Sequence, residues 1–294
     1  MQTRMCRLNG EAFHLWTWGD PGLPPLLMLH GFPEYGGAWA DLATRLADRF
    51  HCVAPDQRGY GRSWSPEGVA HYRGSELVAD MAALADQLGA PLAVLGHDWG
   101  AAVAYGLAMR HPDKVSRLII ANGVHPVPFQ RELARGGAQS EASQYIDALR
   151  RPGSEDRLAA NDYEKLLVLF SAHMDLGWMD DTRRAGYLAA WSQGGGRLGR
   201  MIDWYRASPL RVARPGEPLD DLPALPVDRM RIQCPHLLIW GLGDTALLPV
   251  STEGLEELCT DLTRVELAEA DHWLCHQQPG QVAGLIRDWM AQKA

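Results

Sequence analysis

The residues best suited to chemistry lie in the segment Gly96-His97-Asp98-Trp99-Gly100, between an apolar run and an alanine-rich stretch. The pattern glycine–any residue–nucleophile–any residue–glycine is typical of a sharp turn from a strand into a helix, which presents its central side chain to a ligand. The flanking glycines are needed because such a turn is strained and neighbouring chain passes close to it. The centre here is Asp98, and no Gly-x-Ser-x-Gly pattern occurs in the sequence. A serine nucleophile is therefore excluded.

A carboxylate nucleophile restricts the substrates that the protein can accept. A serine that attacked a saturated carbon would leave an ether, which water does not readily cleave. A carboxylate leaves an ester, which water releases by attack at the carbonyl carbon. Asp98 therefore favours carbon electrophiles, namely epoxides or alkyl halides. The alternative is that Asp98 only caps the following helix, but the complete glycine-flanked pattern favours the nucleophile.

The second half of such a reaction needs a base, and two residues late in the chain fit this need. His272 follows the last predicted strand, 265–268, and Asp244 follows the predicted strand 237–240. Loops that follow parallel strands meet at one edge of a sheet. We expect His272 to deprotonate water, and Asp244 to hold the tautomer of the ring and stabilise the imidazolium. Asp271 is expected to be structural, because a residue adjacent in the chain rarely orients the ring.

A third polar segment, His30-Gly31-Phe32-Pro33-Glu34, directly follows an early apolar run. Its backbone amides can face the turn at Asp98. The N–H groups of Phe32 and Trp99 would then form an oxyanion hole for the tetrahedral intermediate of the ester. Pro33 is a candidate for a cis peptide bond that fixes this loop.

The polar side chains beside these backbone groups have less specific roles. His30 and His97 are expected to hold the loops by hydrogen bonds rather than to take part in the chemistry. Glu34 and His97 are candidates for positioning the hydrolytic water. A surface carboxylate is the alternative for Glu34.

Short apolar runs recur along the chain, each followed by loop residues and a helical pattern, and they predict buried strands at 26–29, 52–54, 92–95, 118–121, 237–240 and 265–268. Unbroken apolar runs of this length suit strands that are buried on both faces, as in a parallel sheet covered by helices. An earlier hairpin is predicted around Asn9-Gly10. The alternation therefore predicts an α/β fold with a mostly parallel twisted sheet and helices on both faces.

The interval from about 125 to 230 breaks this alternation. Helices are expected there at roughly 138–150, 155–172, 183–192 and 198–206, followed by a proline-rich segment at 209–226. We interpret the interval as a helical cap inserted between two late strands. The predicted division is 1–128 for the first part of the core, 129–228 for the cap, and 229–294 for the second part of the core.

The composition argues against several classes of function. The 294 residues carry a net charge of −8 without a basic run, which argues against nucleic acid and anionic membrane as partners. The five cysteines are widely spaced without a Cys-x-x-Cys pair, so neither disulfides nor a zinc ribbon is indicated. No signal peptide is evident, and no apolar segment approaches the ~18 residues of a membrane span. We expect a cytoplasmic protein without cofactor or metal, either a monomer or a homodimer.

Together these motifs resemble those of the soluble epoxide hydrolases of the α/β-hydrolase family. The resemblance rests on HGFPE, the D-x-R-G-Y-G-x-S segment at 56–63, GHDWGA, and the late G-x-x-D and D-H-W patterns, and it runs from about residue 25 to the end. It implies the α/β-hydrolase fold and the conversion of a small apolar epoxide and water to a vicinal diol through an aspartyl ester.

The resemblance also implies two tyrosines in the cap that protonate the epoxide oxygen. Tyr145 lies before Pro152-Gly153, as one family tyrosine does. Tyr205 lies in Asp203-Trp204-Tyr205-Arg206, which matches an N/D-W-Y-R motif in which Asn is the commoner first residue.

Two other functions remain as alternatives. A haloalkane or haloacetate dehalogenase uses the same fold and the same aspartyl ester, and Trp99 could help to bind the halide. Against it, Phe32 stands where many haloalkane dehalogenases have Asn, and Trp99 stands where haloacetate enzymes usually have Arg. A non-catalytic binding protein of the same fold is the second alternative. Such proteins usually lose part of the catalytic triad, and this chain retains it.

Overall fold

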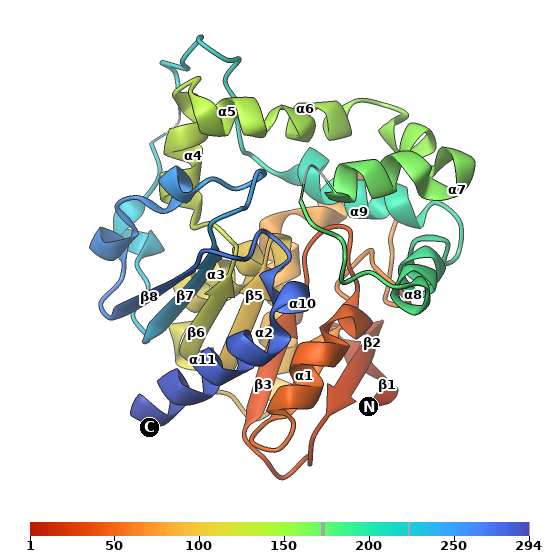
Figure 1. Ribbon diagram of the computed structural model, residues 1–294, viewed down its shortest axis with the longest axis vertical. Coiled ribbons are helices and arrows are strands. Elements are labelled where there is room, and N and C mark those ends of the chain that lie inside the picture. The colour runs from red at the N-terminus through yellow and green to blue at the C-terminus, as the bar shows by residue number, and fades with distance from the viewer. Residues whose placement is uncertain (172–173, 223, 294) are drawn as a thin grey trace.

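A twisted sheet of eight strands forms the centre of the described chain, which comprises residues 1–171, 174–222 and 224–293 of a computed structural model (Figure 1). The strand order is β1-β2-β4-β3-β5-β6-β7-β8. The strands are β1 (Gln2–Leu8), β2 (Glu11–Trp18), β3 (Pro25–Leu29), β4 (His51–Pro55), β5 (Leu92–His97), β6 (Val115–Ala121), β7 (His236–Gly241) and β8 (Leu262–Leu267).

The burial of the strands follows from their sequences. β5 and β7 are apolar throughout except at their ends, and every residue of both is buried, as expected for central strands covered on two faces. The five neighbouring pairs in the order β4-β3-β5-β6-β7-β8 are parallel. The pairs β1–β2 and β2–β4 are antiparallel. The predicted hairpin at Asn9-Gly10 is confirmed, with both residues at positive φ. The mostly parallel sheet is therefore as the sequence predicted.

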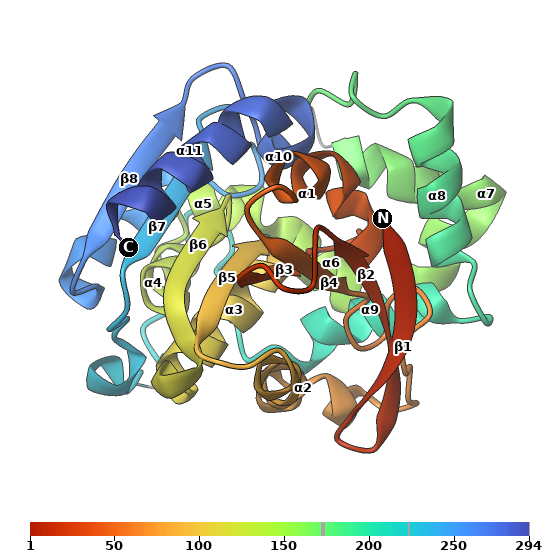
Figure 2. The ribbon, with the colours of Figure 1, turned by 90° about the horizontal axis from the view of Figure 1, so that it is seen from below.

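Helices cover both faces of the sheet. α1 (Ala40–Leu46) and α11 (Pro279–Gln292) pack on one face, where α11 buries Val282, Ile286 and Trp289. α2 (Gly74–Gln87) and α3 (Trp99–Arg110) pack on the other face (Figure 2). Each helix packs an apolar side against the strands, so two hydrophobic cores sandwich the sheet.

Between β6 and β7 the chain leaves the sheet and forms a layer of helices above the ends of the strands (Figure 1). These helices are α4 (Pro126–Ala134), α5 (Ala138–Ala142), α6 (Gln144–Arg150), α7 (Ser154–Ser171), α8 (Asp181–Trp191) and α9 (Arg197–Ala207). The short helix α10 (Leu274–Gln277) follows β8. The predicted helical insertion is present, and the exact domain boundaries at 129 and 229 stay a prediction.

The insertion differs from the prediction in detail. The helix expected at 138–150 is two helices, because Ser143 leaves helical geometry and accepts a hydrogen bond from Gln139. α4 was not predicted as a separate helix; it begins at Pro126, and proline is tolerated in the first turn, where an N–H group lacks a helical acceptor. The expected helix 155–172 is interrupted by non-helical backbone at 160–163. Its last residue, 172, lies outside the described residues.

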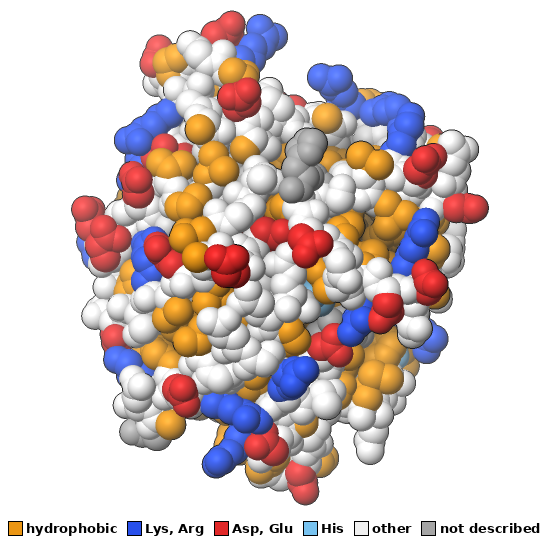
Figure 3. Space-filling view, in the orientation of Figure 1, with side chains coloured by type: hydrophobic (Ala, Val, Ile, Leu, Met, Phe, Trp, Pro, Cys, Tyr) orange, Lys and Arg blue, Asp and Glu red, His pale blue; other side chains and the backbone are white. Residues whose placement is uncertain are grey.

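Charged side chains of both signs are interspersed on the face shown in Figure 3. No described helix is both long and apolar enough to cross a membrane. The five cysteines are all free thiols in the structure.

Candidate active site

Asp98 occupies a strained turn between β5 and α3. Its backbone angles, φ 50° and ψ −121°, lie in a region that residues other than glycine rarely adopt. Neighbouring glycines make this turn possible. A Cβ atom at Gly100 would collide with the carbonyl of Leu29, and a Cβ atom at Gly31 would collide with the Asp98 carboxylate. The turn therefore presents the carboxylate above the end of the sheet, against the loop that contains Gly31.

The two oxygens of the Asp98 carboxylate have different surroundings. The Phe32 N–H group donates a hydrogen bond to Asp98 Oδ1 over 2.7 Å. Trp99 begins α3, where backbone N–H groups lack helical acceptors. The peptide bond between Phe32 and Pro33 is cis, as predicted. Oδ1 is thus held by a backbone donor, and Oδ2 faces His272 at 3.8 Å from Nε2.

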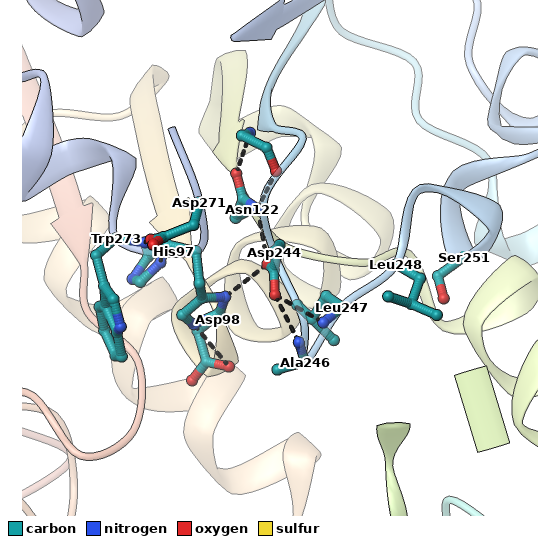
Figure 4. A network of polar contacts seen from close by, with 12 residues as sticks. His97, Asp98, Asn122, Asp244, Ala246, Leu247, Leu248, Ser251, Asp271 and Trp273 are labelled. Atoms are coloured by element: carbon teal, nitrogen blue, oxygen red, sulfur yellow. Dashed lines mark hydrogen bonds and ion pairs between the residues drawn. The ribbon is translucent and has the colours of Figure 1, made fainter. Parts of the chain in front are cut away.

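His272 contacts both Asp98 and Asp244, although it lies far from Asp98 in the sequence. Figure 4 shows Asp98 and Asp244 close together. His272 Nδ1 lies 2.8 Å from Asp244 Oδ2. The Asp244 carboxylate also accepts hydrogen bonds from the N–H groups of Ala246 and Leu247 at 2.9 and 2.8 Å. Asp244 is therefore fixed as an acceptor, and it directs the other ring nitrogen of His272 toward Asp98.

The charges of this group determine its protonation. Burial alone would lower the pKa of His272, but the negative charges of Asp244 and Asp98 and the hydrogen bond to Asp244 raise it to about 9. Burial would likewise raise the pKa of Asp244, but the interaction with His272 lowers it overall. In the resting protein near neutral pH, His272 is therefore an imidazolium between two carboxylates.

This electrostatic arrangement predicts that Asp98→Asn lowers the pKa of His272. The substitution removes a negative charge close to Nε2 and keeps the side-chain shape, so the pKa should fall by roughly 1 to 3 pH units. An NMR titration of the histidine ring carbons would measure it. Asp271→Asn is the matched control, because the Asp271 carboxylate instead accepts from the N–H groups of Asp175 and Trp273. An equal fall in both variants would contradict the assignment of this charge pair.

Two tyrosines from the helical insertion lie at the same cavity as Asp98. Tyr145 belongs to α6 and Tyr205 to α9, and their ring centroids are 6.2 Å apart. Both line a cavity of about 270 Å³ together with Asp98. Burial and the negative charge of Asp98 raise the pKa of each phenol above its usual value. Both phenols therefore remain protonated and can donate a proton or a hydrogen bond.

Glu34 is buried, with 2% of its surface exposed, so the alternative of a surface carboxylate is wrong. Its carboxylate contacts three ring side chains: His97 at 3.0 Å, His276 at 2.6 Å and the Tyr187 hydroxyl at 2.9 Å. Burial would raise the pKa of Glu34, but His276 and His97 lower it well below its usual range. His97 also contacts the carbonyl of His272 at 2.8 Å. Glu34 thus lies in a polar network that reaches His272, and a role in positioning water stays a prediction.

Asn122 is a contributor to the site that the sequence reasoning did not identify. Its side-chain N–H donates to Asp244 Oδ2 over 2.7 Å, and its carbonyl oxygen accepts from the Gly241 N–H group over 2.6 Å. Asn122 also has positive φ at the end of β6. The sequence did contain a pattern that could have identified Asn122, because Asn122-Gly123 directly follows a buried strand. The ends of neighbouring parallel strands meet at the site, so a polar residue at that position is a candidate.

The remaining candidates have structural partners. His30 Nδ1 contacts the Gly31 carbonyl, and His30 Nε2 accepts from the Gln57 N–H group, as expected of a residue that holds the loop. Cys275 is buried beside His276, and no group of three metal-ligating side chains assembles within the described ranges.

Comparison with known proteins agrees with this architecture. The α/β hydrolase fold family matches residues 24–279, so the chain belongs to that family. Its relatives within the family include proteins named as epoxide hydrolases. Human epoxide hydrolase 4 is 30% identical over 293 residues, which cover 97% of this chain and 77% of that protein. The AB hydrolase superfamily protein YfhM of Bacillus subtilis is 33% identical over 287 residues, 96% of this chain and 95% of that one.

Solved structures agree as well. One from a study of novel epoxide hydrolases in metagenomes from hot environments has 36% identity, a TM-score of 0.86 and coverage of 98% of both chains. The epoxide hydrolase of Bacillus megaterium in complex with an inhibitor has 28% identity and a TM-score of 0.84, and the match covers 98% of this chain and all of that one.

Proposed function

We propose that this protein is an epoxide hydrolase that forms vicinal diols through a covalent ester of Asp98. One observation carries the proposal. A carboxylate at the strained turn has Oδ1 bound by a backbone N–H group and shares its cavity with two protonated phenols, of which Tyr205 is buried and Tyr145 half-buried. A nucleophile and proton donors around one apolar space are what the opening of a neutral three-membered ring requires.

In the first half-reaction, Asp98 Oδ2 attacks an epoxide carbon. The bond from that carbon to the ring oxygen breaks, and its electron pair goes to the ring oxygen. That oxygen takes a proton from Tyr205 or Tyr145, so a poor alkoxide leaving group never has to form fully. The tyrosinate that remains recovers a proton, through water, when the His272 imidazolium loses one to become the neutral base. The hydrogen bond from Phe32 to Oδ1 supports this role for Oδ2, because it assigns Oδ1 as the future ester carbonyl oxygen.

In the second half-reaction, His272 takes a proton from water, and the hydroxide adds to Cγ of the ester. The developing charge on Oδ1 is stabilised by the N–H groups of Phe32 and Trp99. Collapse of the tetrahedral intermediate breaks the bond between Cγ and Oδ2, and His272 returns the proton to the leaving diol. Alkylation of Asp98 removes one of the charges that raise the pKa of His272, so ester formation itself prepares the base.

Product analysis tests this function. Purified protein should convert small apolar epoxides to diols and release no halide from alkyl halides of matched size. A single turnover in ¹⁸O-labelled water should give unlabelled diol, because the new oxygen comes from Asp98. Later turnovers should give labelled diol. Halide release without diol would establish a dehalogenase instead.

Label in the first diol formed would contradict the ester route while leaving the overall activity in place. Neither product from any substrate would favour a binding protein of this fold. The variant Asp98→Asn serves as the control for contaminating activity, since an amide is a poor nucleophile.

A further inference from the structure

A buried glutamine joins the helical insertion to the loop that follows β7. Gln139 lies in α5, and only 1% of its surface is exposed. A glutamine amide has two N–H donors and an oxygen that accepts two hydrogen bonds, and partners occupy all four positions here. Nε2 donates to the Ser143 hydroxyl and the Ala246 carbonyl over 2.8 and 2.9 Å. Oε1 accepts from the Leu248 N–H group and the Ser251 hydroxyl, each over 2.7 Å.

The loop that follows β7 is held from two sides. The Ala246 N–H group donates to Asp244 Oδ1 over 2.9 Å, while the Ala246 carbonyl accepts from Gln139. Figure 4 shows Asp244 between Asp98 on one side and Ser251, a partner of Gln139, on the other. The position of Ala246, which supplies a donor to Asp244, therefore depends on the helical insertion as well as on the sheet.

The same amide holds the start of the helix that carries Tyr145. Gln139 and Ser143 are four residues apart, a spacing that brings side chains together on one side of a helical segment. Ser143 ends α5 and directly precedes α6, in which Tyr145 is the second residue. Tyr145 from α6 and Leu247 from the loop both line the cavity of Asp98. The amide of Gln139 thus joins two elements that each form part of the cavity.

The need to satisfy buried polar groups does not by itself explain this arrangement. Gln130 of α4 is also buried in the insertion, and its amide bonds the backbone N–H and carbonyl of a single residue, Arg211. Gln139 instead bonds two elements that carry different reacting groups. Apolar packing brings such elements together without a preferred direction, whereas hydrogen bonds have a preferred length and angle. The four bonds of Gln139 therefore fix how the two elements lie relative to each other.

We propose that Gln139 is a positioning residue that holds the loop of Asp244 and the helix of Tyr145 in one arrangement, so that both half-reactions depend on it. This inference rests on the function proposed above and adds a residue that does not line the described cavity. A displaced loop weakens the hydrogen bond by which Asp244 holds His272 for ester hydrolysis. A displaced α6 moves the Tyr145 hydroxyl away from the epoxide oxygen during ring opening.

The test replaces Gln139 with Met, which nearly preserves the length of the side chain and removes the amide. Gln139→Met should slow both ring opening and ester hydrolysis by about 10- to 100-fold, since a misplacement of about 1 Å can cost about 100-fold. Rapid-quench single-turnover experiments with styrene oxide measure the two rates. The proton NMR resonance of the His272 Nδ1–H group reports the hydrogen bond to Asp244. It should move upfield, and its proton should exchange faster with water.

Two serine variants separate the two sides of this junction. Ser251→Ala removes a partner of Gln139 in the loop of Asp244 and should slow ester hydrolysis more than ring opening. Ser143→Ala removes the partner that precedes Tyr145 and should slow ring opening more than ester hydrolysis. Each variant deletes a single hydroxyl, so the pair tests the proposal even if Gln139→Met does not fold.

Gln130→Met is the matched control, because it removes a buried amide of the same insertion that bonds only Arg211. It should lower the melting temperature without changing either rate or the His272 resonance. If Gln139→Met does the same, its amide only stabilises the insertion and the proposal is overturned. Serine variants that both react at the wild-type rates would overturn it as well.

The NMR measurement separates this inference from the proposed function, because it needs no substrate. If the wild type gives no diol, the proposed function fails. A changed His272 resonance in Gln139→Met would then still support the positioning of Asp244 by Gln139, and an unchanged resonance would overturn it.

Discussion

Replacing His272 with Gln should leave the protein able to open an epoxide but unable to release the product, so that an ester of Asp98 accumulates. Ring opening needs the Asp98 carboxylate and the phenols, whereas ester hydrolysis needs the base next to Oδ2. Loss of a general base typically slows a step by roughly 10²- to 10⁴-fold. Intact-protein mass spectrometry should show one substrate molecule added per chain, and peptide mapping should locate it on Asp98.

Two variants make this result specific. Asp98→Ala should form neither adduct nor diol. Asp271→Asn, which changes a carboxylate adjacent in the chain but bound to other backbone groups, should turn over without accumulating an ester. An adduct on any other residue, or ordinary turnover by the His272 variant, would remove the basis for the assigned nucleophile and base.

Replacing both Tyr145 and Tyr205 with Phe should slow ring opening by roughly 10²- to 10⁴-fold or more, the usual cost of losing a general acid. Each single variant should retain measurable activity, because the two phenols line the same cavity and can substitute for one another in part. The loss should fall on ester formation and leave ester hydrolysis unchanged. Rapid-quench single-turnover experiments separate these two steps.

Tyr163→Phe is the control for this pair. Tyr163 is also a tyrosine of the helical insertion, but it packs against Trp191 away from the cavity of Asp98. Phe nearly preserves ring volume, and circular dichroism would verify that the fold survives. A double variant that opened epoxides at the wild-type rate would show that other groups protonate the ring oxygen.

The parts of the site that sequence reasoning found are those with a local signature. The turn at Asp98 needs glycines at fixed spacing, and this requirement is visible in five consecutive residues. His272 and Asp244 were found because each follows an apolar run, and the carboxyl ends of parallel strands meet at one edge of a sheet. The 2.8 Å contact between them agrees with that expectation.

The parts that sequence reasoning missed depend on packing between distant segments. Whether Glu34 is buried depends on Tyr187 from α8 and His276 from α10, and no local pattern links these residues to it. The support that Asn122 gives to Asp244 depends on the alignment of β6 with β7. α4 was missed because prolines usually argue against a helix, although the first turn accepts them.

The loop that carries the Phe32 N–H group is joined to helix α8 by two hydrogen bonds, from Trp191 to the Pro33 carbonyl and from Tyr187 to Glu34. Lifting α8 away from the sheet would break both bonds and loosen the donor that holds Asp98. The cavity of Asp98 is also lined by Gly74 and Pro209, which are exposed, and no described residue of α8 lines it. We therefore expect substrate exchange to need no movement of α8. We expect turnover to be limited by chemistry or by diffusion through a fixed passage, so that added viscogen, rather than a hinge substitution, would change the rate of entry.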